Sequence, residues 1–153
     1  MAPYSQSNRL RALRIYLSTA ATLHLAWEVL QLPLYTIWRT GDLREIAFAI
    51  LHCTAGDLMI ASLSLLTALL VFGNRSWPTD GFIPVMVVTL VIGVSYTIYS
   101  EWVNTVVRKI WTYSPLMPTL PVLGTGLSPL MQWLMVPVAG FAAIRRKYKR
   151  MDI

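Results

Sequence analysis

The chain has 153 residues, of which 56% are hydrophobic and 13% are charged, and its formal net charge is +6. A soluble domain usually has about 25% charged residues, so this composition excludes an ordinary soluble globular protein and indicates a membrane protein. The basic residues flank long apolar runs and are not interleaved with exposed aromatic residues, so we expect no nucleic-acid partner.

Four apolar runs follow one another along the chain. A helix needs about 20 mostly apolar residues to cross roughly 30 Å of hydrocarbon. Four segments meet this length, namely 15–38, 46–72, 82–107 and 127–144. We therefore predict an all-α fold, an integral membrane four-helix bundle formed by a single domain of residues 1–153.

The segment 111–126 separates the third run from the fourth. Pro115, Pro118 and Pro121 exclude a regular helix here, but the segment is too apolar for a solvated loop. We predict a proline-rich outer segment, a lid or a re-entrant loop, which is stable only when it packs on protein or lines a cavity.

The loops predict the orientation. Four spans place both chain ends on one side of the membrane, and nine Lys and Arg residues fall on that side against four on the other. Cytoplasmic loops carry the excess of basic residues in membrane proteins. We therefore expect a multi-pass protein with its N- and C-termini in the cytoplasm.

The first run carries a polar stripe. His24, Glu28, Gln31 and Tyr35 follow one another at helical spacing and fall within roughly 60° of one helix face. An ionisable group in the middle of a bilayer costs roughly 2.5–3.5 kcal/mol even on insertion scales, so such groups usually face protein or water. We expect the stripe to face the bundle interior, with Trp27 as a wall of the site.

The second run contributes Asp57, which shares a helix face with Cys53. His52 points about 140° away from Asp57, so these two residues are not expected to bind one ligand together. Cys53 is the only cysteine, which excludes an intrachain disulfide. Gly56 predicts a small-residue surface at which a neighbouring helix can approach closely.

The third and fourth runs complete the predicted site. Glu101 and Asn104 share a face with Arg108, and Trp102 is a second candidate wall. Gln132 adds an amide from the fourth run. Antiparallel packing would align these groups as a polar funnel that is open to the non-cytoplasmic side and ends in the middle of the membrane.

Two resemblances add to this interpretation. Residues 99–104 (Y-S-E-W-V-N) and 124–133 (G-T-G-L-S-P-L-M-Q-W) resemble a group of small bacterial four-helix inner-membrane proteins, from which no function is carried over. This resemblance covers most of the chain from His24 onward and implies a bacterial cytoplasmic (inner) membrane. The sequence H-L-A-W-E, from His24 to Glu28, resembles the H-x3-E element of EXPERA-domain sterol isomerases. In that family a histidine and a glutamate move a proton across a lipid double bond, which implies acid–base chemistry for this pair.

The leading hypothesis is an intramembrane polar pocket that binds a lipidic or small amphipathic molecule. Its acid–base residues would be His24 and Glu28, with Asp57 as the orienting group or second acid. Isomerase or cyclase chemistry and binding without catalysis both remain open. No metal, haem or other cofactor is expected. The ligand contacts would be Trp27, Gln31, Tyr35, Glu101, Trp102, Asn104 and Gln132.

Three alternatives compete with this hypothesis. The chain could be a proton-coupled transporter or channel subunit in which Glu28, Asp57 and Glu101 form a relay. It could be an accessory or assembly subunit, or a homo-oligomer, whose buried acids pair with cations of a partner. The same polar groups could also simply join helices by buried hydrogen bonds. The apolar cytoplasmic half of the predicted bundle favours a closed pocket over a passage.

Overall fold

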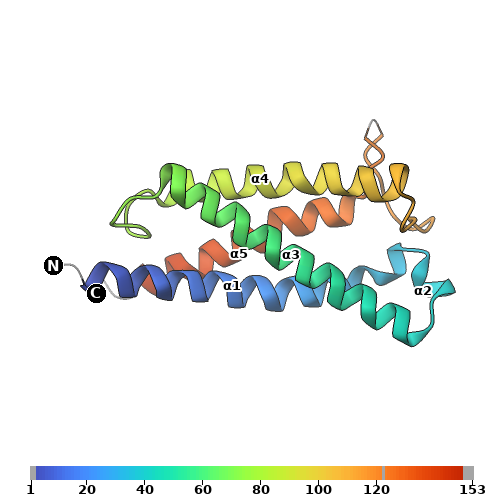
Figure 1. Cartoon of the computed structure of the whole chain (residues 1–153), viewed down its shortest axis with the longest axis horizontal. Helices are drawn as coiled ribbons and strands as arrows, with labels where there is room; N and C mark the ends of the chain where they lie inside the picture. The colour runs from blue at the N-terminus through green and yellow to red at the C-terminus, as the bar shows by residue number, and fades with distance from the viewer. Residues whose placement is uncertain (1–2, 122, 150–153) are drawn as a thin grey trace.

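The computed structural model describes residues 3–121 and 123–149, and most of them are helical (Figure 1). A 3-10 turn (Leu32–Leu34) follows the first helix, and a π-helical turn (Val103–Val107) extends the fourth. No strand occurs in the described ranges, so the predicted all-α class is confirmed. The α-helices are α1 (Pro3–Gln31), α2 (Ile37–Thr40), α3 (Leu43–Phe72), α4 (Phe82–Trp102) and α5 (Leu127–Lys149).

Four of these helices are long and lie side by side (Figure 1). Helix α1 packs against α3 and α5, and α4 packs against the same two helices, so that the four enclose a common interior. The start of α1, the end of α5 and the 73–81 loop lie at one end of the molecule. Helix α2 and the 103–126 connection lie at the other end.

Three of the long helices meet the length and hydropathy that a membrane span requires. They are α3 (Leu43–Phe72), α4 with its π-helical turn (Phe82–Val107), and α5 (Leu127–Tyr148). Large apolar side chains cover their outer surfaces, as Leu70, Phe48 and Val91 illustrate. Apolar surface of this extent is typical of contact with lipid and indicates a membrane protein.

An apolar core fills the end of the bundle that holds the chain ends. It draws side chains from α1, α3, α4, α5 and the 73–81 loop, and it supports the sequence-based expectation that this half has an apolar interior. Its buried members are Ala12, Tyr16, Ala61, Leu65, Ala68, Trp77, Val85, Trp133, Phe141, Ile144 and Tyr148.

The first helix is shorter at its C-terminal end than the predicted 15–38 run. Helix α1 ends at Gln31 because Pro33 lacks an N–H and disfavours the α conformation in the residue before it. The chain then forms a 3-10 turn and becomes extended at Tyr35. The polar stripe therefore continues on α1 only as far as Gln31, and Tyr35 belongs to the connection.

A capping box begins α3 after this connection. The Asp42 side chain accepts from the Glu45 backbone N–H at 2.8 Å, and the Glu45 carboxylate accepts from the Asp42 N–H at 3.0 Å. These reciprocal bonds satisfy two of the amide donors that a helix N-terminus leaves without partners. The predicted second run thus becomes a helix that starts three residues earlier, at Leu43.

The described residues of the proline-rich segment 111–126 form no helix, as the prolines predict. The segment packs on the turn that follows α1, where Tyr35 and Tyr113 form an antiparallel bridge and the Ser114 hydroxyl donates to the Pro33 carbonyl at 2.9 Å. A second bridge joins Thr119 to Gly126. Tertiary hydrogen bonds therefore take the place of the helical ones that the prolines prevent.

Candidate functional site: a buried acid–base cluster

The side-chain amide of Gln132 is the centre of a polar group between three helices. Its Nε2 atom, from α5, lies 2.9 Å from Asp57 Oδ2 of α3. The same atom lies 3.0 Å from Glu28 Oε1 and 2.9 Å from His24 Nδ1, both of α1. His24 Nδ1 and Asp57 Oδ2 are 3.2 Å apart. We call these four residues, His24, Glu28, Asp57 and Gln132, the acid–base cluster.

The protons of the cluster can be assigned from these distances. An amide nitrogen has two hydrogens, so Gln132 Nε2 cannot donate to three acceptors at once. Three of the four contacts become hydrogen bonds when Gln132 donates to Glu28 and Asp57 and the His24 ring donates from Nδ1 to Asp57. The contact between Gln132 Nε2 and His24 Nδ1 is then the one without a hydrogen bond. The orienting role predicted for Asp57 fits this arrangement, because the carboxylate fixes both the tautomer and the direction of the imidazole.

The cluster is buried in an otherwise apolar environment. His24 is fully buried, Gln132 is 2% exposed and Glu28 is 9% exposed, while the Asp57 side chain is 14% exposed. The predicted polar stripe of α1 therefore faces α3 and α5. Both acids face the interior of their own bundle and not its outer perimeter.

A chain of hydrogen bonds joins the cluster to the end of the bundle that carries the 103–126 connection. Gln31 Nε2 donates to Glu28 Oε1 at 2.8 Å, and the Ser128 hydroxyl donates to Gln31 Oε1 at 2.9 Å. The indole N–H of Trp27 donates to the Ser128 oxygen at 3.1 Å. Trp27 and Gln31, both predicted from the sequence, thus belong to the same polar network as the cluster.

Trp133 is a neighbour of the cluster that the sequence analysis missed. Its indole N–H lies 3.3 Å from Asp57 Oδ1, and its ring centroid is 5.3 Å from that of His24. The position next to Gln132, in the middle of an apolar helix, was the signal that could have identified it. Most tryptophans of membrane proteins lie at the interface, whereas Trp133 is buried.

The other ring nitrogen of His24 has no partner. Nε2 is buried and makes no hydrogen bond to any of the described residues. Buried polar atoms are nearly always paired with protein or with ordered water, and an unpaired one costs free energy. His24 Nε2 is therefore the position of the cluster at which a ligand or a water molecule would gain a hydrogen bond.

Glu101 forms a separate polar group with Tyr113. The buried Glu101 carboxylate accepts from the Tyr113 hydroxyl, and the Gly126 backbone N–H donates to the same hydroxyl oxygen at 2.9 Å. Burial raises the pKa of Tyr113 because a phenolate would lose its hydration, so this hydroxyl stays protonated and donates. Arg108, which shares the predicted helix face with Glu101, is exposed.

The remaining predicted residues have other contacts. Asn104 donates to the Ser100 carbonyl of its own helix at 2.9 Å. Trp102 is 48% exposed and lines a surface cleft beside Leu123. Tyr35 packs on Tyr113 with ring centroids 5.5 Å apart. Hydrogen bonds therefore join Trp27 and Gln31 to the cluster, whereas the described residues show none between the cluster and Tyr35, Trp102 or Asn104.

His52 is exposed on the surface of α3 and stacks on Phe48 at a centroid distance of 5.4 Å. Within the described residues, no three His, Cys, Asp or Glu side chains form a group that could hold a metal ion. Comparisons with protein-family models, with curated proteins and with solved structures found no match to this chain. Support for a function therefore comes from the acid–base cluster itself.

Tyr113→Phe tests the attachment of the proline-rich segment. The change removes the donor to Glu101 and the acceptor of the Gly126 N–H, so we expect amide exchange at Gly126 and along 111–126 to accelerate about tenfold or more. Hydrogen-exchange mass spectrometry in detergent measures this rate. Tyr99→Phe, at an exposed tyrosine of α4, is the matched control and should change nothing. Equal exchange rates in the two variants would contradict the hydrogen bonds of the Tyr113 hydroxyl with Glu101 and Gly126.

Proposed function

We propose that this chain is an integral membrane protein whose acid–base cluster binds a lipidic or small amphipathic molecule and transfers protons to and from it. The observation that carries the proposal is the meeting of His24, Glu28 and Asp57 around one amide inside an apolar bundle. Burying two acids and a histidine in a low-dielectric interior costs free energy. Such groups are typical of a binding or catalytic site.

Each member has a chemical role in this proposal. His24 Nε2 takes a proton from the bound molecule, while Asp57 holds the ring through Nδ1 and stabilises the imidazolium that forms. Glu28 in its acid form gives a proton to a second position of the same molecule. Because one proton is gained and one is lost, the product is an isomer. A proton then passes from the His24 imidazolium back to Glu28, which restores both groups, and no co-reactant is consumed.

The apolar core supports a closed site over a passage. The polar network runs from the cluster towards Trp27 and Ser128 at one end, whereas the other half of the bundle is filled by buried apolar residues such as Leu65 and Phe141. A proton relay across the membrane needs polar groups on both sides of its centre. A transporter or channel subunit remains the second candidate, and proton flux into proteoliposomes that Asp57→Asn abolishes would favour it.

The direction of the acids supports a self-contained site over an assembly subunit. Glu28 and Asp57 both accept from Gln132 of the same chain, so both acids have a hydrogen-bond donor within their own bundle. An acid that awaits a partner's cation would be expected on the outer face. Neutral substitutions should therefore change ligand binding and leave any association with other chains intact.

The proposal includes a four-span topology in a bacterial inner membrane. Helix α1 packs against two candidate spans, α3 and α5, and places His24 and Glu28 between them, so we propose that α1 crosses the membrane as well. The excess of basic residues at the end with the chain termini supports a cytoplasmic location for that end. The proline-rich segment would then lie on the outer side, over the site.

Reporter fusions test this topology. A reporter in the 73–81 loop and one at the C-terminus are both expected to give a cytoplasmic signal, because both positions belong to the more basic side. A reporter in 111–126 is expected to give the opposite signal. A non-cytoplasmic signal at the C-terminus would reject the orientation, and equal signals at 73–81 and 111–126 would reject the span between them.

Glu28→Gln tests the site. The variant keeps an oxygen that can accept from Gln31 and Gln132, so the fold should persist while the acid is lost. Native mass spectrometry with lipid analysis of the purified protein should recover about tenfold less ligand, the effect of losing about one hydrogen bond. Conversion of that ligand should fall by about 10²–10⁴.

Glu45→Gln is the control for this experiment. Glu45 is exposed, and glutamine serves equally well as the third residue of a capping box, so this variant should retain the ligand. A wild-type protein that carries no ligand, together with unchanged behaviour of Glu28→Gln, would overturn the proposed function.

A further inference from the structure

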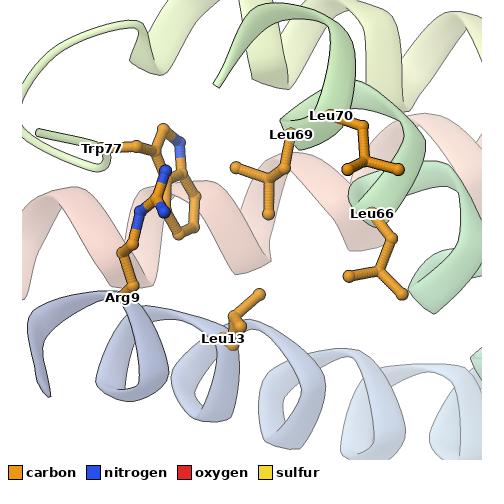
Figure 2. A pocket seen from close by; sticks show the side chains of 6 residues that line it. All are labelled: Arg9, Leu13, Leu66, Leu69, Leu70 and Trp77. Atoms are coloured by element: carbon orange, nitrogen blue, oxygen red, sulfur yellow. The ribbon is translucent and has the colours of Figure 1, made fainter. Parts of the chain in front are cut away.

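A second site lies at the opposite end of the bundle from the proline-rich segment. A cleft of about 190 Å³ opens between α1 and α3, and the 73–81 loop closes one end of it (Figure 2). We propose that this cleft binds an anionic phospholipid, with the phosphate on Arg9 and part of one acyl chain along the leucines. The lining residues are Arg9, Leu13, Leu66, Leu69, Leu70 and Trp77.

Arg9 supplies the charged end of the cleft. Figure 2 shows Arg9 and Trp77 at one end and the α3 leucines at the other. One terminal nitrogen of Arg9 donates to the Asn74 backbone carbonyl, which fixes the side chain against the loop. Its Nε has no hydrogen-bond partner among the described residues, although it is buried. A guanidinium has five N–H donors in a planar fork that matches a phosphate group, so an anionic oxygen would satisfy this donor.

The leucines supply an apolar wall that is open to the outside. Leu70 is 86% exposed and Leu66 is about half exposed, and both lie in the last two turns of α3. Because α3 is a candidate membrane span, its last turns lie where hydrocarbon meets the headgroups. The cleft thus leads from a cation at headgroup depth to apolar surface at hydrocarbon depth, which is the arrangement of a phospholipid.

Charge favours an anionic lipid over a zwitterionic one. Basic residues from the start of α1, the 73–81 loop and the end of α5 gather at this end of the molecule. Among the described residues at this end, Asp80 is the one acid, and it already accepts from the Asn74 side-chain amide. A basic surface next to a membrane span attracts the negative charge of anionic lipids.

Native mass spectrometry of the full chain in detergent tests the proposal. The probes are phosphatidylglycerol, phosphatidylcholine with the same acyl chains, and free glycerol phosphate. We expect phosphatidylglycerol to be retained about tenfold better than phosphatidylcholine, the effect of one charge-assisted hydrogen bond. Glycerol phosphate should not compete because it lacks the acyl chain. Equal retention of the two lipids would overturn the proposal, and so would competition by glycerol phosphate at the affinity of the lipid.

Two pairs of variants separate the charged and apolar parts of the site. Arg9→Gln should remove the preference for phosphatidylglycerol, whereas Arg14→Gln, at an exposed arginine of the same helix, should keep it. Leu66→Trp should fill the cleft and reduce retention of both lipids about tenfold. Leu51→Trp, at an exposed leucine elsewhere on α3, should not.

These variants keep the proposal testable even where one of them fails to fold. The bond from Arg9 to the Asn74 carbonyl joins α1 to the loop, so Arg9→Gln could fail to fold. In that case Leu66→Trp still tests whether a lipid occupies the cleft. Unchanged retention in Leu66→Trp would overturn the proposal. Glu28→Gln should leave retention at this cleft unaltered, so the result is independent of the acid–base cluster.

Discussion

Gln132→Leu is expected to lower the free energy of unfolding by about 2–5 kcal/mol, the range for a buried polar network that loses a central member. Leucine has nearly the same size as glutamine, so the change removes hydrogen bonds and leaves no large cavity. Glu28 and Asp57 would each lose a donor at about 3 Å in a site that water does not reach freely. Equilibrium unfolding in mixed micelles, followed by tryptophan fluorescence, measures the loss.

Gln31→Leu is the matched control for this measurement. Gln31 is also a buried amide, but it donates to one acid, Glu28, and so its loss should cost about 1–3 kcal/mol. Adding Glu28→Gln to Gln132→Leu should recover part of the stability, because it replaces a buried carboxyl group that has lost the Gln132 donor with an amide that has its own N–H groups. A loss below about 1 kcal/mol for Gln132→Leu would contradict the central position of this amide.

The membership of the cluster was predictable from helical spacing. His24 and Glu28 are four residues apart and share one face of α1, and antiparallel packing brings Asp57 to the same depth. Gln132 was predicted only as a ligand contact. Its central position depends on the side-chain conformation and on the rotation of α5, and neither of these is encoded in residue spacing.

The Tyr113–Glu101 bond illustrates a second limit of sequence analysis. Tyr113 lies in a segment without periodicity, so no helical spacing relates it to Glu101. The end of α1 was missed for a related reason. The Thr36 N–H donates to the Thr112 carbonyl at 3.0 Å, and the Ser114 N–H donates to the Leu34 carbonyl at 2.9 Å. These long-range partners stabilise the end of α1 before Pro33, and no local sequence pattern specifies them.

The glycines show that a sequence pattern does not specify which small residues pack closely against another helix. Gly56 was predicted to allow close approach of a helix, but a Cβ at that position would have no neighbour within 4 Å. The close approaches occur at Gly93, which faces the Trp133 ring, and at Gly140, which faces the Tyr16 ring. A small residue permits contact, but only the opposite helix determines whether a large side chain fills the space.

Gly93→Ala is expected to lower the free energy of unfolding by about 1–3 kcal/mol or more, the usual cost of overpacking a core. The new Cβ would lie 2.3 Å from Cε3 and 2.5 Å from Cζ3 of Trp133, which is closer than real carbon contacts. Trp133 cannot move away freely, because it packs on His24 and its indole N–H is directed at Asp57. The strain should therefore reach the acid–base cluster and weaken ligand retention as well.

Gly56→Ala is the matched control, and it should act in the opposite direction. Both changes add one methyl group to a glycine inside a long helix, where alanine is intrinsically favoured by about 1 kcal/mol. At Gly56 nothing opposes this preference, so the variant should be slightly more stable than the wild type. Unfolding of the two variants side by side, with ligand retention by native mass spectrometry, makes the comparison. Equal effects would contradict the close contact between α4 and α5, and Trp133→Leu in the Gly93→Ala background should relieve the clash if that contact is its cause.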